Sequence, residues 1–234
     1  MSTTNFFNFS FLPKYLSLFV QGIEYTLLLS VVSVCLAVLP ALFLALMRLS
    51  KLRVVRAISG IYIAIFRSTP LLVQLALVYF GLFNYIRVPT VRIFGFINLA
   101  MFIPGVVALA LNSAAYVAEI FRAGILAVDS GQNEAARSLG LTAGDSMSMV
   151  VLPQAIKNVL PALANEIITM VKESSICSTL GMVELMWAAK TVAATTYITI
   201  GPYVMVALAY FCINYPASKL IEAVERRMRR GDKR

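Results

Sequence analysis

The chain has 234 residues, of which 60% are hydrophobic, a mean hydropathy of +0.83 and a net charge of +9. This hydrophobic fraction is larger than a soluble protein with one or two hydrophobic cores requires, so the composition predicts a membrane protein. The absence of histidine excludes imidazole metal sites and histidine-dependent triads, and no Gly-rich phosphate loop occurs, so we expect no metal ion and no cofactor.

The first predicted membrane span is residues 25–47, which contain no charged residue and exceed the length of about 20 residues that a hydrocarbon core requires. The preceding lead, residues 1–21, is rich in phenylalanine and carries Lys14, and we interpret it as a short interfacial segment. Four basic residues follow the span at once. By the positive-inside rule they place this end in the cytoplasm and the N-terminus outside. They are Arg48, Lys51, Arg53 and Arg56.

The second apolar run, residues 57–86, is interrupted in its middle by the polar stretch Arg67-Ser68-Thr69-Pro70. Because Ser or Thr before Pro is typical of a helix start, with Pro at the first helical position, we predict a broken or kinked second span. A short outer loop then leads to the third span, residues 93–118, which is again uncharged and returns the chain to the cytoplasm.

The segment between the third and fourth spans, residues 129–153, is polar and lies between apolar runs. Asp129 or Ser130 can cap a first short helix, Gly140 suits the position after its end, and Thr142 with Asp145 forms a capping box for a second helix. The pattern predicts a helix-turn-helix presented to the water phase. An ordinary, well-capped cytoplasmic loop is the alternative.

The fourth span, residues 154–177, is the least hydrophobic. At 100° per residue its polar side chains share one arc of about 120°, so they must face a bundle interior or a cavity. Five helices surround a wide aqueous path poorly, and we expect the cavity to form across a dimer. Helix–helix hydrogen bonds without a ligand are the alternative. The stripe comprises Asn158, Asn165, Glu166, Thr169, Lys172 and Glu173.

The fifth span, residues 191–218, is uncharged and precedes an arginine-rich tail. In this topology fifteen of the 20 basic residues lie on or near the cytoplasmic side, which is a membrane signal, and we expect no nucleic-acid partner. The sequence thus predicts an all-α integral membrane protein of about five spans. Residues 1–234 form one domain, with the N-terminus outside and the C-terminus in the cytoplasm.

Depth along the helices brings two polar groups to the same level. Arg67 and the pair Asn165 and Glu166 each lie about ten residues, or about 15 Å, from the cytoplasmic end of their spans. Where the second span restarts after its break, the free N–H groups of the helix N-terminus can bind a carboxylate. Glu166 can bind an ammonium or guanidinium group, so an amino acid zwitterion would suit both sites. An ion pair between Arg67 and Glu166 is the alternative. The candidate substrate residues are Arg67, Ser68, Thr69, Asn165, Glu166, Thr169, Lys172 and Glu173, and the two glutamates favour a cationic side chain.

The loop also carries a family resemblance. Glu134-Ala135-Ala136, three residues, Gly140, nine residues and an aliphatic-x-Leu152-Pro153 ending resemble the loop of bacterial ABC-importer permeases that docks onto the ATP-binding subunit. Residues 66–74 and 118–125 resemble the polar amino acid subfamily, the histidine, glutamine and arginine importers. The sequence departs from this subfamily at two positions, with Ser68 where the family usually has glycine and Gly201 where an acidic residue is common. The identity of the transported amino acid is therefore not settled by the resemblance. The resemblance implies a type I ABC importer-like fold with docking residues Glu134, Ala135, Ala136, Gly140, Leu152 and Pro153.

The same resemblance implies a function in the cell membrane. The chain would be the permease subunit of an ATP-driven amino acid importer that works by alternating access, and it would not itself be an enzyme. Its partners would be an ATP-binding subunit dimer, a second permease copy or a related permease, an extracytoplasmic amino acid-binding protein, a polar amino acid and membrane lipid. A secondary amino acid transporter or channel is the alternative, although it would have no use for a docking loop.

Overall fold

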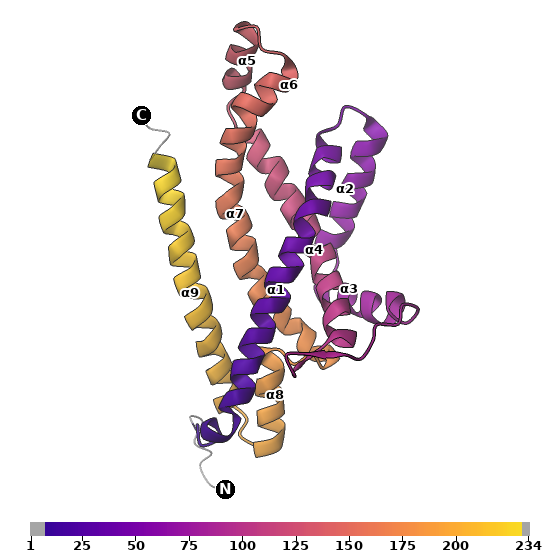
Figure 1. Ribbon diagram of the computed structural model, residues 1–234, viewed down its shortest axis with the longest axis vertical. Coiled ribbons are helices and arrows are strands. Elements are labelled where there is room, and N and C mark those ends of the chain that lie inside the picture. The colour runs from indigo at the N-terminus through magenta and orange to yellow at the C-terminus, as the bar shows by residue number, and fades with distance from the viewer. Residues whose placement is uncertain (1–7, 231–234) are drawn as a thin grey trace.

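Four long helices run along the length of the molecule in the computed structural model, which describes residues 8–230, with side chains to residue 228 (Figure 1). They are α1 (Leu12–Leu49), α4 (Leu99–Leu126), α7 (Leu152–Glu173) and α9 (Gly201–Arg230). Among the described residues, four helical stretches are long and apolar enough to cross a membrane, and a bent helix pair makes five when it is counted as one span. The number of spans therefore agrees with the prediction of about five.

Helix α1 is longer than predicted. It begins at Leu12, so residues 12–21 of the predicted interfacial lead are helical, while residues 1–7 of that lead lie outside the described part of the chain. The physical reason is burial, because Phe11 and Phe19 pack in one cluster with α8 (Leu185–Thr196) and α9. With 38 residues the helix is about 57 Å long, well beyond the hydrocarbon thickness of about 30 Å.

Small side chains let α1 and α4 approach closely. Ala37, Ala41 and Ala45 of α1 are fully buried against a cluster that includes Ala114 and Ala118 of α4. Small residues at such spacing are a common device for helix packing in membranes, where close backbone contact replaces the hydrophobic effect. This contact fixes α4 at the centre of the bundle, next to α1, α2 (Arg53–Ser68) and α7.

The second apolar run is broken, as predicted. Helix α2 (Arg53–Ser68) ends at the polar stretch, and α3 (Leu71–Ala76) with the π-helical η1 (Leu77–Leu82) turns away from it by 106°. Figure 1 shows α3 directed sideways from the bundle. Two details of the prediction were wrong: Pro70 is the extended N-cap of α3 rather than its first residue, and the Thr69 hydroxyl donates back to the Ile65 carbonyl at 2.8 Å.

The third span differs from its prediction at both ends. Residues 92–98 form a hairpin of β1 (Arg92–Ile93) and β2 (Ile97–Asn98), with a turn at Phe94 and Gly95, both at positive φ. Apart from this short hairpin the described fold is helical, as the predicted all-α class requires. Helix α4 starts at Leu99, where the Asn98 side chain accepts a hydrogen bond from the Ala100 N–H at 3.0 Å.

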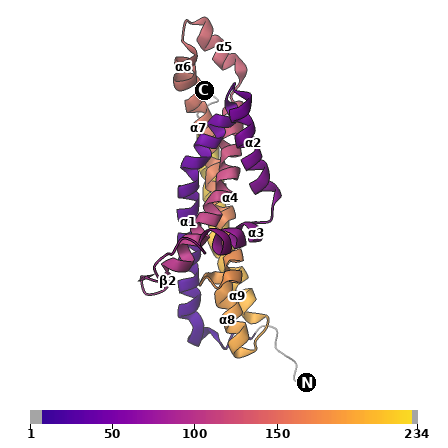
Figure 2. The ribbon, with the colours of Figure 1, turned by 90° about the vertical axis from the view of Figure 1, so that its right-hand side faces the viewer.

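The loop segment folds as α5 (Ser130–Ser138), α6 (Ala143–Ser146) and the π-helical η2 (Met147–Val151), which runs directly into α7. The fourth span, predicted as residues 154–177, thus joins the loop without a break, and beyond α7 it tightens into the 3-10 turn η3 (Ser174–Leu180). Figure 2 shows α5 and α6 projecting beyond the turn between α1 and α2. We call this the loop end of the molecule.

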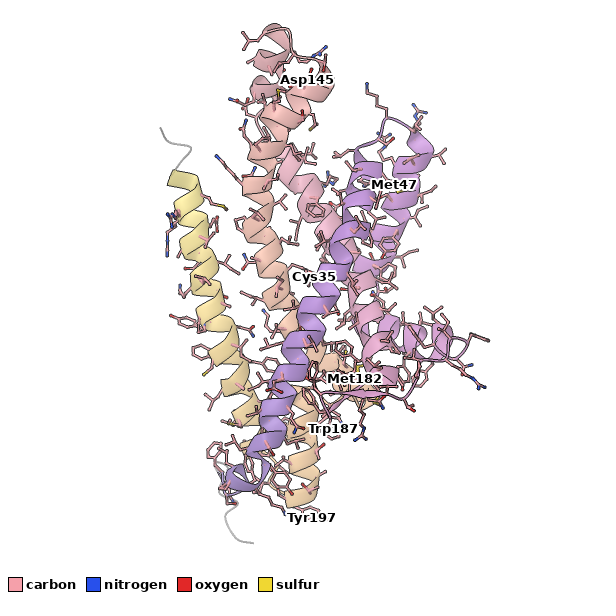
Figure 3. All side chains as sticks on the ribbon, in the orientation of Figure 1. Cys35, Met47, Asp145, Met182, Trp187 and Tyr197 are labelled. Atoms are coloured by element: carbon pink, nitrogen blue, oxygen red, sulfur yellow. The ribbon has the colours of Figure 1, made fainter. Side chains whose placement is uncertain are left out.

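The last span is present as α9, but its predicted bounds, residues 191–218, were wrong because the chain reverses within them. Helix α8 ends at Thr196, Tyr197 takes a left-handed φ of 58°, and α9 begins at Gly201. Glycine is required there because a β-carbon would collide with the carbonyl oxygen of Asn8. Trp187 and Tyr197 mark α8 at the end of the molecule opposite Asp145 (Figure 3). The end of α8 and the first part of α9 are both uncharged, so the absence of charge alone did not separate the two helices.

A buried carboxylate begins helix α8. Glu184 accepts hydrogen bonds from the backbone N–H groups of Met186 at 2.9 Å and Trp187 at 2.6 Å, and from the Tyr210 hydroxyl at 3.3 Å. Gly22 of α1 touches the start of α8 so closely that an added β-carbon would stand 2.9 Å from the Leu185 Cα. These contacts tie α8 to both α1 and α9.

Candidate functional site

The predicted docking loop is a pair of short helices with well-formed caps. Asp129, rather than Ser130, caps α5 by accepting from the Gly131 N–H at 2.7 Å, and Gly140 takes φ +90° at the turn. The Thr142 hydroxyl accepts from the Asp145 N–H at 3.2 Å and donates to the Asp145 carboxylate at 2.6 Å. These local features agree with the capping pattern read from the sequence.

The two helices of the loop are also joined to each other. The Ser146 hydroxyl donates to the Asn133 amide oxygen at 2.6 Å, and Ala136 is buried. The other predicted docking residues are exposed: Glu134, Ala135, Gly140, Leu152 and Pro153. Five of the six docking residues are therefore accessible to a partner on a surface whose backbone is fixed by hydrogen bonds.

Two apolar side chains on this loop were not singled out by the sequence. Leu139, at the end of α5, is 85% exposed, and Met149 in η2 is 67% exposed. Both lie on an element that projects from the apolar bundle (Figure 2), where apolar exposure is unfavourable unless another protein covers it. The sequence feature that could have indicated them is the presence of large apolar residues within an otherwise polar loop.

The eight candidate substrate residues do not form one surface. Glu166 is only 9% exposed and accepts a hydrogen bond from the Ser113 hydroxyl of α4 at 2.8 Å. Asn165 and Lys172 are exposed, and Thr169 and Glu173 are half-buried. The 120° polar arc of α7 is thus divided, because Glu166 packs against α4 while Asn165 and Lys172 line spaces beside α9.

Two cavities lie between α7 and α9, which also contact each other directly. The first, of about 390 Å³, lies toward the loop end and is lined by Asn158 and Asn165 together with Glu225 of α9. The second, of about 510 Å³, is lined by Lys172 and Ser175 together with Tyr210, Asn214 and Tyr215. Polar groups therefore border open space along much of α7.

The other candidate group lies at the break between α2 and α3. Arg67, Ser68 and Thr69 are all exposed, and the Arg67 guanidinium stands 5.3 Å from the centre of the Tyr116 ring on α4. No ion pair joins Arg67 to Glu166 in the described part of the chain. The pairing alternative is not realised, and each group instead contacts α4.

Two buried amides hold the helix break. Gln74 Nε2 donates to the Phe66 carbonyl at 2.8 Å and to the Thr69 carbonyl and hydroxyl at 3.0 and 2.8 Å. Asn112 Nδ2 donates in turn to Gln74 Oε1 at 2.8 Å. The pair satisfies backbone carbonyls that the bend leaves without helical partners. An unsatisfied backbone group is costly in the hydrocarbon region of a membrane. Neither residue is among the predicted site residues, although a polar residue within an uncharged apolar run is a usable signal.

Helix α4 is the common support of both candidate groups. Within five residues it provides Asn112 to the helix break, Ser113 to Glu166 and Tyr116 to Arg67. A shift of α4 would therefore move Arg67 and Glu166 together. This coupling follows from contacts between distant parts of the chain and has no counterpart in local sequence patterns.

Comparison with known proteins decides the family. Residues 33–230 match the family model described as the binding-protein-dependent transport system inner membrane component. The chain belongs to this family. The match confirms a multi-pass inner-membrane permease and favours it over the secondary transporter or channel that the sequence had left as an alternative.

Individual relatives place the permease among amino acid transport systems. It is 40% identical over 212 residues to the arginine transport system permease protein ArtQ of Bacillus subtilis, covering 91% of this chain and 93% of the relative. It is 38% identical over 218 residues to a putative glutamine transport system permease protein GlnP of Rickettsia typhi, covering 93% and 95%. The predicted resemblance to polar amino acid permeases is confirmed.

Solved structures agree with this placement. The permease matches a chain of the crystal structure of an amino acid ABC transporter with histidines, with a TM-score of 0.85, 46% identity and coverage of 94% of this chain and 98% of the other. A chain of the MetNI methionine ABC transporter matches with a TM-score of 0.67 at 20% identity, covering 89% and 97%. The second match bears on the fold alone, and together they confirm the predicted type I importer fold.

Proposed function

We propose that the permease imports a polar amino acid by alternating access, driven by a separate ATP-binding subunit that docks on α5, α6 and η2. The observation that carries this proposal is the docking loop, a hydrogen-bonded helix pair that exposes Leu139 and Met149 at one end of the bundle. Packing of these apolar side chains into the ATPase would transmit its movement to α7, which continues from η2 without a break. ATP hydrolysis belongs to that subunit.

We infer the orientation in the membrane from the basic residues at the loop end. The turn between α1 and α2, the docking loop and the end of α9 all lie there (Figure 1), and this end carries Arg48, Lys51 and Arg226. Basic residues of this kind favour the cytoplasmic side. In a variant without the three native cysteines, Asn84→Cys should react with an impermeant label from outside, and Ser138→Cys only after permeabilisation. The reverse pattern would invert the orientation.

The translocation path would run along the polar face of α7. Asn165 and Lys172 are exposed on a helix that crosses the membrane, and such groups must face water or another protein. A second permease copy or a related permease would cover this face and complete the path. Substrate would reach it from an extracytoplasmic amino acid-binding protein at the α8 end.

The substrate would bind between the two groups held by α4. Arg67 is exposed and meets no carboxylate among the described residues, so it suits the carboxylate of an amino acid. Glu166 uses Oε1 to accept from Ser113, which leaves Oε2 for a cationic group. With Glu173 half-buried on the same helix, the balance favours arginine or a similar cationic amino acid over glutamine.

The test is transport by the reconstituted complex of permease, ATP-binding subunit and binding protein. A panel of arginine, lysine, histidine, glutamine and leucine should give ATP-dependent uptake for polar substrates, strongest for the cationic ones. Arg67→Gln should reduce uptake, while Arg87→Gln, an exposed arginine outside the proposed path, serves as the matched control. Uptake that persists without ATP, or that Arg67→Gln leaves unchanged, would contradict the driving force or the site respectively.

A further inference from the structure

The turn between α1 and α2 gathers four basic side chains within nine residues, and we call residues 48–56 the basic hairpin. Lys51, Arg53 and Arg56 are exposed. Arg48 is half-buried and lies over α2 at Gly60, where an added β-carbon would stand 2.9 Å from its Nη1 atom. One cation is thus held against the helix at the base of the turn, and three surround it at the surface.

None of these four cations is neutralised by a side chain in the part of the chain that the structure describes. They make no ion pair or side-chain hydrogen bond within the described residues, and the sequence contains no acidic residue between Glu24 and Glu119. Other cations of the chain do have acidic partners: Arg122 forms an ion pair with Glu119 at 2.8 Å, and Lys219 forms one with Glu222 at 2.9 Å. The basic hairpin is therefore a concentrated, uncompensated positive charge, which attracts anions from outside the chain.

The surface that continues from the basic hairpin is apolar. Val54 is 72% exposed, and Ile58, Ile61 and Ile65 are exposed on the same side of α2 at spacings of four, three and four residues. This spacing makes one helix face. From Val54 to Ile65 this face contains no polar side chain, unlike the exposed face of α7, so it suits acyl chains rather than water. The exposed Ser68 follows at the helix break.

Cations at the end of an acyl-facing helix lie where phospholipid headgroups lie. We propose that the basic hairpin binds the phosphate groups of anionic phospholipids, with the acyl chains along the α2 face. Each basic residue near an anionic membrane surface strengthens binding by about five-fold. The inference requires a membrane but not the transport function, so either can fail without the other.

The test measures lipid affinity of the full-length permease. Purified protein in a neutral detergent is titrated with phosphatidylglycerol and, separately, phosphatidylcholine, and bound lipid is counted by native mass spectrometry. The combined variant Lys51→Gln, Arg53→Gln and Arg56→Gln keeps Arg48 on the helix. It should lose about a hundred-fold in phosphatidylglycerol affinity, at about five-fold per residue, and nothing in phosphatidylcholine affinity.

A matched control removes the same charge at three exposed positions outside the basic hairpin, through Lys14→Gln, Arg87→Gln and Arg92→Gln. This control should bind phosphatidylglycerol as the unchanged permease does. Equal losses in both variants would reveal a net-charge effect and overturn the proposal. Displacement of the lipid by millimolar inorganic phosphate would indicate a free-anion site and overturn it as well. So would a hairpin variant that loses the ATP-binding subunit but keeps its lipid affinity, because the hairpin would then contact protein.

Discussion

Leu139 offers the sharpest test of the docking loop. Its side chain is 85% exposed in the permease, so Leu139→Ala should change the stability of the isolated subunit by no more than about 0.5 kcal/mol. If the ATP-binding subunit buries Leu139, the same change removes buried apolar surface in the complex. Such a truncation costs about 2 kcal/mol, which corresponds to an affinity about 30-fold lower.

The assay is binding of the purified ATP-binding subunit to the permease in lipid nanodiscs, followed by ATP-dependent uptake in vesicles. Leu77→Ala is the matched control, since Leu77 is 67% exposed but lies in η1, away from the docking loop. The control should bind as the unchanged permease does. Equal affinities for all three proteins, with uptake intact, would refute the claim that Leu139 is buried on docking.

Three further predictions concern the caps and the buried polar groups. Gly140→Ala should destabilise the loop by about 1 to 2 kcal/mol, because φ is +90° there, and limited proteolysis should then cleave residues 129–153 faster; an unchanged rate would contradict the strain. Ser113→Ala takes the hydrogen-bond donor from Glu166 and should cost about 1 to 3 kcal/mol in unfolding measurements, whereas Ser113→Thr should retain most of the stability; equal losses would point to packing instead. Burial raises the pKa of Glu184 to about 7 from 4.5, so its stabilising contribution is complete below pH 4.5 and is lost as the pH rises through 7. Thermal unfolding should show this fall in the unchanged permease and a flatter profile in Glu184→Gln; parallel profiles would argue against the assignment.

The sequence alone determined the features that arise from local chemistry. Uncharged runs predicted membrane helices because the bilayer requires about 20 apolar residues per span. The stretch ending in Thr69 and Pro70 predicted the helix break, and Asp129, Gly140 and Thr142 predicted the caps of the loop helices. In each case the residues that decide the backbone lie within a few positions of one another, so no knowledge of the fold was needed.

The tertiary structure decided which polar groups meet. Periodicity placed Glu166 on a polar face of α7, but only the packing of α4 against α7 shows that it accepts from Ser113 rather than pairing with Arg67. Helix ends shifted for the same reason. Residues 12–21 are helical because they pack against α8 and α9, and the predicted fifth span breaks at Tyr197 where the chain reverses to bring α9 back. These outcomes depend on contacts between segments far apart in the chain, and a local pattern of polar and apolar residues cannot encode which segments become neighbours.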